Sequence, residues 1–200
     1  MGNKKMTFRG FNTPSLVLIP AAVGINYIGK YFATVLKLPL WLDSIGTVLA
    51  SILAGPIVGA LSGAINNIIS GLTVDPVAFI YAITSIAIGL TTGILANKDY
   101  FSSFQKAFGA GIIVAVVAAI VSTPINIWFW NGQTGNIWGD ALYAFLVAHQ
   151  HPVWLASFLD EIVVDLPDKI ITVIFSYIIF KSLPQKLTYL FSPNNKIETL

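Results

Sequence analysis

One stretch near the end of this sequence gathers several side chains that could carry chemistry. It contains four carboxylates, a lysine and a proline: Asp160, Glu161, Asp165, Pro167, Asp168 and Lys169. On a helix, the charged residues from Glu161 onward share one stripe, because their spacing follows the helical repeat. Neighbouring carboxylates can share a proton in catalysis or transport, and they can also bind a polar ligand. A structural alternative is that Asp165 and Lys169, four residues apart, neutralise each other.

Other patterns that could support catalysis or cofactor binding are weak. The glycine-rich stretch Gly24 to Lys30 has the spacing of a phosphate-binding loop, but Tyr31 stands where Mg²⁺ needs a serine or threonine. His149 and His151 lack the partners of a metal site, and the chain has no cysteine. We therefore expect no enzymatic activity, no metal and no cofactor bound by this chain.

The composition indicates that lipid is the solvent for much of the chain. Of the 200 residues, 56% are hydrophobic and only 10% are charged, whereas a soluble domain carries about 25% charged residues. The net charge of +2 says little by itself, and we expect no nucleic-acid partner. The length suits a single domain, residues 1–200.

The apolar segments predict an all-α integral membrane protein with six transmembrane helices. A spanning helix needs about 20 apolar residues, although the second segment here has only ten. We expect helices at 15–36, 45–54, 57–72, 77–96, 108–130 and 153–181. Residues 131–152 form an outer loop, in which 137–150 is expected as a short amphipathic helix on the membrane surface.

The basic residues predict that both termini are cytoplasmic. Six spans place the two ends on one side of the membrane, and cytoplasmic loops are enriched in lysine and arginine. The residues on that side include Lys4, Lys5, Arg9, Lys98, Lys106, Lys181, Lys186 and Lys196. Residues 1–14 and 183–200 are then cytoplasmic segments.

The charged stripe must lie at membrane depth or in a cavity open to the outside. After Lys169 only the apolar run 170–180 remains, which is about 16 Å of helix, half of the hydrocarbon thickness. Ionisable groups at that depth mark a functional site by default. All five tryptophans map to the outer half, which indicates either an interfacial belt or an aromatic pocket that includes Trp128 and Trp130.

Small residues recur at helical spacing and predict close helix packing. Gly55, Gly59 and Gly63 share one face, and so do Ser85, Gly89 and Gly93. Ala21, Ala22 and Gly24 form a similar patch on the first helix. Asn66 and Asn67 follow the first glycine face, and we expect one of them to bond a neighbouring helix or to face a ligand.

These segments resemble a known family of membrane proteins. The stretch Leu53 to Gly63, followed by Asn66-Asn67 and by Ser85 to Gly93, is similar to the third and fourth helices of the S components of energy-coupling factor (ECF) importers. The resemblance implies a vitamin-binding subunit in the bacterial plasma membrane, without ATPase activity of its own. Its partners would be a transmembrane coupling subunit and two ATP-binding cassette subunits, which consume ATP.

The resemblance also implies a docking face on the first helix. Family members often carry Ala-x-x-x-Ala there, whereas in this chain Ala21 is followed four residues later by Ile25 and Ala22 by Asn26. The patch Ala21, Ala22 and Gly24 is therefore the expected contact with the coupling subunit. The general appearance favours pyridoxine or hydroxymethylpyrimidine as the vitamin, with pantothenate and cobalamin left open.

We expect an outward-facing binding site at the outer ends of the third, fifth and sixth helices. Its residues are predicted to be Asn67, Trp128, Trp130, Asn131, Asp165 and Asp168. Aromatic rings would supply flat apolar area, and the amides and carboxylates would orient a ligand that carries a protonated nitrogen or several hydroxyls. Two rival functions are a proton-coupled secondary transporter that uses Asp165 or Asp168, and an intramembrane hydrolase with a carboxylate pair.

Overall fold

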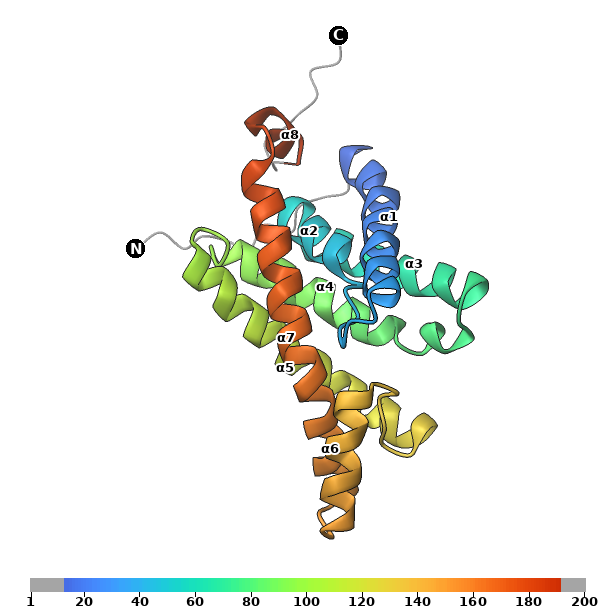
Figure 1. Cartoon of the computed structure of the whole chain (residues 1–200). Helices are drawn as coiled ribbons and strands as arrows, with labels where there is room; N and C mark the ends of the chain where they lie inside the picture. The colour runs from blue at the N-terminus through green and yellow to red at the C-terminus, as the bar shows by residue number, and fades with distance from the viewer. Residues whose placement is uncertain (1–12, 192–200) are drawn as a thin grey trace.

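The computed structural model describes residues 13–191, and this part of the chain is entirely helical (Figure 1). It forms eight α-helices and one short 3-10 helix, with no strand in the described range. The elements are α1 (Thr13–Val35), α2 (Ile45–Ala54), α3 (Pro56–Thr73), η1 (Pro76–Phe79), α4 (Ala82–Asn97), α5 (Phe104–Trp130), α6 (Ile137–Ala148), α7 (Val153–Ser182) and α8 (Gln185–Leu190). The all-α class predicted from the sequence is confirmed.

The helix limits follow the apolar segments with two notable differences. The expected fourth helix begins at Ala82 rather than at residue 77, because Asp75 accepts a hydrogen bond from the Val77 amide and caps the separate turn η1. The fifth begins earlier than expected, at Phe104, where the Ser103 side chain caps it. Residues 1–12 and 192–200 lie outside the described residues, and they include Lys4, Lys5, Arg9 and Lys196 of the predicted cytoplasmic side.

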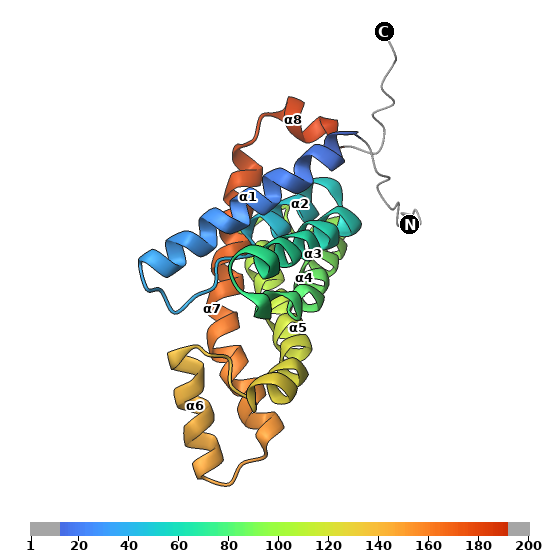
Figure 2. The same cartoon turned by 90° about the vertical axis from the view of Figure 1, so that its right-hand side faces the viewer.

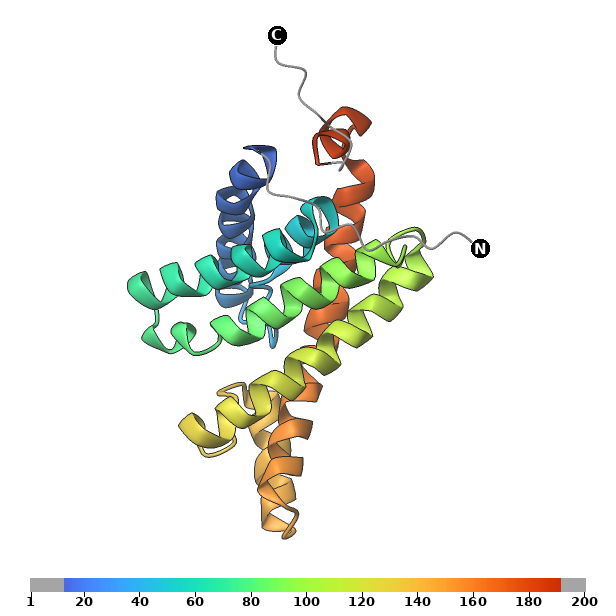
Figure 3. The same cartoon turned by 180° about the vertical axis from the view of Figure 1, so that it is seen from behind.

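Helix α7 runs the length of the molecule, and the other elements are arranged along it (Figure 1). Helix α5 packs against α7, and α4 lies beside α5 (Figure 3). Helix α2 is short, and all ten of its residues are buried among α1, α3, α4 and α7. Helices α1 and α5 are long and apolar enough to cross a membrane.

Helix α6 forms a hairpin with the first half of α7 (Figure 2). Gly139 allows this approach, because a Cβ built there would lie 1.8 Å from the Asp160 Oδ1 atom. The amphipathic segment expected on the membrane surface is thus packed along α7. The side chains of Ile137 and Trp138 on α6 remain exposed.

Glycines bring α3 and α4 into backbone contact, as their spacing predicts. A Cβ built on Gly89 would lie 2.4 Å from the Ala60 amide nitrogen, and one on Gly93 would lie 2.3 Å from the Pro56 Cα atom. Neither gap admits a methyl group without separating the helices. The apolar core next to this contact joins α2, α4, α5 and α7 around Val48, Ile88, Val114 and Val173.

The contact at Gly89 generates a stability prediction. We expect Gly89→Ala to lower the free energy of unfolding by about 1–3 kcal/mol, the usual range for overpacking. The measurement is unfolding of the purified chain in increasing sodium dodecyl sulfate, followed by circular dichroism.

Gly109→Ala is the matched control, since nothing lies within 4 Å of a Cβ built on Gly109 in α5. It should be neutral or stabilise the chain by up to about 1 kcal/mol. Equal effects of the two substitutions would contradict the assigned contact between α3 and α4.

Candidate functional site

A cavity of about 610 Å³ lies beside the middle of α7, where the α1–α2 and α5–α6 connections meet α4 and α7. Its volume is within the range of small-molecule sites. Aromatic side chains in its wall are Trp41, Tyr81, Phe129 and Trp130. The charged side chains in the wall are Asp43, Asp75, Asp140, Glu161, Asp165, Lys30 and Lys169.

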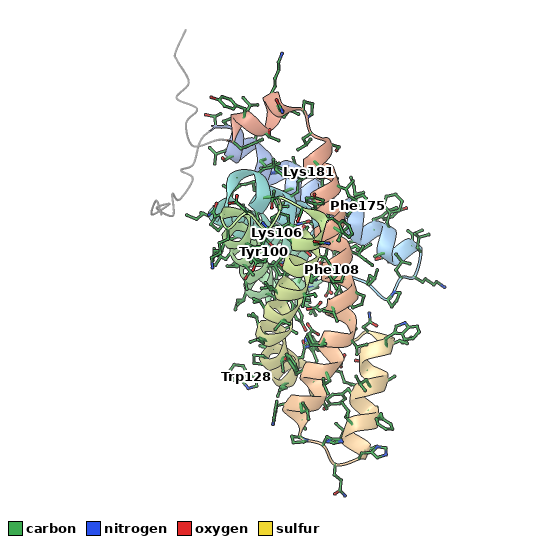
Figure 4. The ribbon with its side chains drawn as sticks, turned by 90° about the vertical axis from the view of Figure 1, so that its left-hand side faces the viewer. Tyr100, Lys106, Phe108, Trp128, Phe175 and Lys181 are labelled. Carbon is green, nitrogen blue, oxygen red and sulfur yellow. The ribbon has the colours of Figure 1, made fainter. Side chains whose placement is uncertain are left out.

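The end of the molecule where α5 begins and α7 ends carries lysines. Lys106, at the start of α5, and Lys181, at the end of α7, lie toward that end, whereas Trp128 lies far from them (Figure 4). Tyr100 and Phe108 also lie toward these lysines, so aromatic side chains occur in both regions (Figure 4). The region of the cavity is distinguished by its five acidic side chains.

Lys169 forms ion pairs with two aspartates of the charged stripe. Its Nζ atom lies 2.6 Å from the Asp168 Oδ2 atom and 3.5 Å from the Asp165 Oδ1 atom, and all three residues are buried. The pairing of Asp165 with Lys169, which the sequence left as a structural alternative, is present, and Asp168 extends it. Asp165 and Lys169 also line the cavity, so this network forms part of its wall.

Asp168 holds a connecting loop and does not line the cavity. Its Oδ1 atom accepts hydrogen bonds from the backbone amides of Trp41, at 3.0 Å, and Leu42, at 2.9 Å. The carboxylate is fully buried by the α1–α2 loop and Lys169. The sequence-based prediction that Asp168 contacts a ligand is therefore corrected: it positions the loop that carries Trp41 and Asp43 into the cavity wall.

Glu161 is held by a chain of hydrogen bonds from α5 and from the residue that precedes α4. Its Oε2 atom accepts from the Asn126 amide at 3.0 Å, and the Asn126 Oδ1 atom accepts from the Tyr81 hydroxyl at 2.5 Å. Asn126 is fully buried, and Glu161 is only 6% exposed. Because both ends of the Asn126 amide are bonded, its NH₂ group stays directed at Glu161.

The loop after α5 closes one side of the cavity. Thr134 donates its hydroxyl to the Asp160 Oδ1 atom at 2.8 Å and its amide to the Asp140 Oδ1 atom at 3.1 Å. Asn131 has left-handed backbone torsions at the end of α5, and its carbonyl accepts from the Tyr143 hydroxyl. These bonds fix the position of a loop whose residues 133–135 line the cavity.

Burial of its carboxyl raises the pKa of Asp43 above the ordinary value, and the nearby Lys169 and Lys30 ammoniums oppose that change. Asp43 lies in the α1–α2 loop. The loop held by Asp168 therefore brings another acidic group to the lysines of the cavity wall.

The predicted site residues divide into those that line the cavity and those that do not. Asn67, Trp130, Asn131 and Asp165 line it, whereas Trp128 does not. Trp128 is 83% exposed and lies on the outside of α5 (Figure 4), so its expected place in the pocket is corrected. Residues 128 and 130 on a helix differ by about 200° in direction, which explains why only one of them faces inward.

The two asparagines of α3 have different surroundings. The Asn67 amide donates to the Gly63 carbonyl and to the Ser85 hydroxyl, and the residue also lines the cavity. Asn66 is buried away from the cavity lining. Asn67 thus joins α3 to α4 at the cavity wall.

The small patch on α1 is partly exposed. Ala21 and Gly24 lie on the exposed face together with Val17 and Ile28, but Ala22 is only 1% exposed. The Ala22 backbone supports α2, because a Cβ built on Gly46 would lie 1.9 Å from the Ala22 carbonyl oxygen. Ala22 is therefore corrected from a surface contact to an internal one.

Several lining residues were not predicted from the sequence. Trp41 and Tyr81 lie in connections between helices, where helical periodicity carries no information about direction. Glu161 was visible as the first member of the charged stripe, but only the fold shows that it lines the cavity and that Lys169 pairs with Asp165 and Asp168 instead. For Glu161, its place on the same helical stripe as Asp165 was the sequence signal that could have identified it as a lining residue.

Comparison with protein-family models, with curated proteins and with solved structures finds no match to this chain.

The bonds of Asp168 generate a second stability prediction. Asp168→Asn leaves Lys169 with a weaker partner and places an NH₂ group near donors, so the free energy of unfolding should fall by about 3–5 kcal/mol, the usual cost of breaking a buried ion pair. Unfolding in sodium dodecyl sulfate measures the change. Asp99→Asn, on an exposed turn, is the control and should change stability by less than about 0.5 kcal/mol. If Asp168→Asn left the free energy of unfolding unchanged, Asp168 would not be the residue that holds the α1–α2 loop.

Proposed function

We propose that this chain is the substrate-binding subunit of an ATP-driven importer of the ECF type, embedded in the bacterial plasma membrane. The observation that carries the proposal is the cavity of about 610 Å³, walled by aromatic and polar side chains in an otherwise apolar helical protein. Such a cavity captures a small molecule. The best candidates remain pyridoxine and hydroxymethylpyrimidine, which are vitamins or vitamin precursors with a planar ring.

The membrane setting is supported by apolar side chains that face outward. Besides α1 and α5, which are long enough to span, α7 exposes Ile171, Phe175 and Ile178. Soluble proteins rarely expose apolar patches that continue over several helices. In our proposal the helices form six spans with both termini cytoplasmic, and the lysine-bearing end faces the cytoplasm.

Energy for uptake would come from partner subunits. The sequence contains no credible nucleotide site, so we assign ATP hydrolysis to two ATP-binding cassette subunits. A transmembrane coupling subunit would transmit their conformational change to this chain. Ala21 and Gly24 offer a shallow exposed strip on α1 for contact with the coupling subunit, since small residues let helices approach closely.

Nothing favours the two rival functions. A proton-coupled transporter was expected to use Asp165 or Asp168, yet Lys169 pairs with both of them. A hydrolase needs two carboxylates that converge on a substrate. Here Asp168 accepts hydrogen bonds from the α1–α2 loop, and Asp160 accepts one from Thr134.

Partner docking tests the proposal. Gly24→Leu should abolish co-purification of ATP-binding cassette ATPase activity with the tagged chain from native membranes, because the leucine widens the contact on α1. Gly109→Leu is the matched control, since a Cβ at either glycine meets nothing within 4 Å inside this chain. The control should retain the ATPase. The proposal fails if the purified chain alone, in sealed vesicles, concentrates pyridoxine under a proton gradient.

A further inference from the structure

Glu161 is a buried carboxylate in the cavity wall without a basic partner. Among the described residues, no lysine or histidine nitrogen forms an ion pair with it within 4.0 Å. The nearest lysine of the stripe, Lys169, is bonded to Asp168 and paired with Asp165. Lys30, the other lysine of the wall, donates to the Ser70 hydroxyl at 3.5 Å. Both basic groups of the cavity therefore have other partners.

The position of Glu161 is fixed rather than adaptable. Asn126 donates to one carboxylate oxygen, and Tyr81 in turn fixes the Asn126 amide. A carboxylate that accepts a hydrogen bond and lacks a counter-charge favours a cationic group placed beside it. The arrangement thus prepares an acceptor for a positive charge before any ligand arrives.

The whole cavity has the same electrostatic preference. Five acidic side chains and two lysines line it, so acidic groups outnumber basic groups in the wall. Low-dielectric walls of one sign concentrate ligands of the opposite sign. An anionic ligand such as pantothenate would face repulsion from most sides.

Aromatic side chains near Glu161 complete the subsite. Tyr81 is linked to Glu161 through Asn126, and Trp130 and Phe129 line the same cavity from the end of α5. Aromatic faces attract organic cations and stack on planar rings. The combination suits a heteroaromatic ring that carries a protonated or quaternary nitrogen.

We propose that Glu161 is the cation-binding residue of this cavity and that the ligand is a small aromatic molecule with a positively charged nitrogen. This inference rests on the proposed function as a binding subunit and narrows its substrate class. Glu161, rather than Asp165 or Asp168, then determines specificity for charge.

The experiment compares pyridoxamine and pyridoxine, which share a ring and differ by an ammonium group in place of a hydroxyl. Calorimetric titration of the purified full chain at neutral pH should give at least tenfold tighter binding of pyridoxamine. Glu161→Gln should reduce that preference to within about threefold, because it removes the charge that attracts the ammonium group of pyridoxamine. Equal binding of both probes by the wild-type chain, or a preference that survives Glu161→Gln, would overturn the inference.

Asp75→Asn is the matched control for general electrostatics. Asp75 also lines the cavity, and an asparagine retains the acceptor that caps η1 while removing the charge. It should keep the tenfold preference. Loss of the preference to the same extent as in Glu161→Gln would contradict a specific role for Glu161.

Mass spectrometry of molecules released from the purified wild-type chain gives a readout that needs neither probe nor variant. A released cationic aromatic compound supports the inference, whereas a neutral or anionic one overturns it and leaves the proposed function standing. If the chain releases no compound and binds neither probe, the proposed function fails together with the inference.

Discussion

The ion pairs of Lys169 are the interaction on which the cavity depends. An ammonium group buried in an apolar bundle needs carboxylate partners, and α7 supplies them at Asp165 and Asp168. The other carboxylate oxygen of Asp168 accepts hydrogen bonds from two backbone amides of the α1–α2 loop. One buried charge network therefore joins α7 to the α1–α2 loop, which brings Trp41 into the cavity wall. Without it, the α1–α2 loop would lose its bonds to α7, although the loop after α5 would keep its own.

The two ends of the bundle divide structural and binding roles. Toward the lysine-bearing end, small residues and valines let α2, α4, α5 and α7 pack closely, and Gly93 meets the start of α3 there. Toward the other end, polar residues on the same helices replace apolar contacts by hydrogen bonds. Asn67, Asn126 and Glu161 each bond a neighbouring helix, and this leaves room between the helices for a ligand. The stability gained by close packing at one end thus offsets the stability lost by leaving an open cavity at the other.

Periodicity and composition predicted the helices and the glycine contact, because both depend on local spacing. The direction of individual side chains at the cavity was harder to predict. Trp128 and Trp130 share a residue type and a helix end, but the helical twist separates them. Asp168 looked available for a ligand, since no sequence pattern reveals that a loop more than 120 residues away covers it. Glu161 stood in the predicted stripe, and only the tertiary partners distinguish it from its neighbours.

The central claim is that the cavity, and not the outer aromatic surface, binds the ligand. The most direct measurement is native mass spectrometry of the purified wild-type chain, Trp130→Ala and Trp128→Ala, with the retained small molecule counted per protein. The account predicts that wild type and Trp128→Ala retain one molecule per chain, while Trp130→Ala loses most of it and stays folded by circular dichroism. Retention by Trp130→Ala together with loss in Trp128→Ala would place the site on the outer surface and contradict the account.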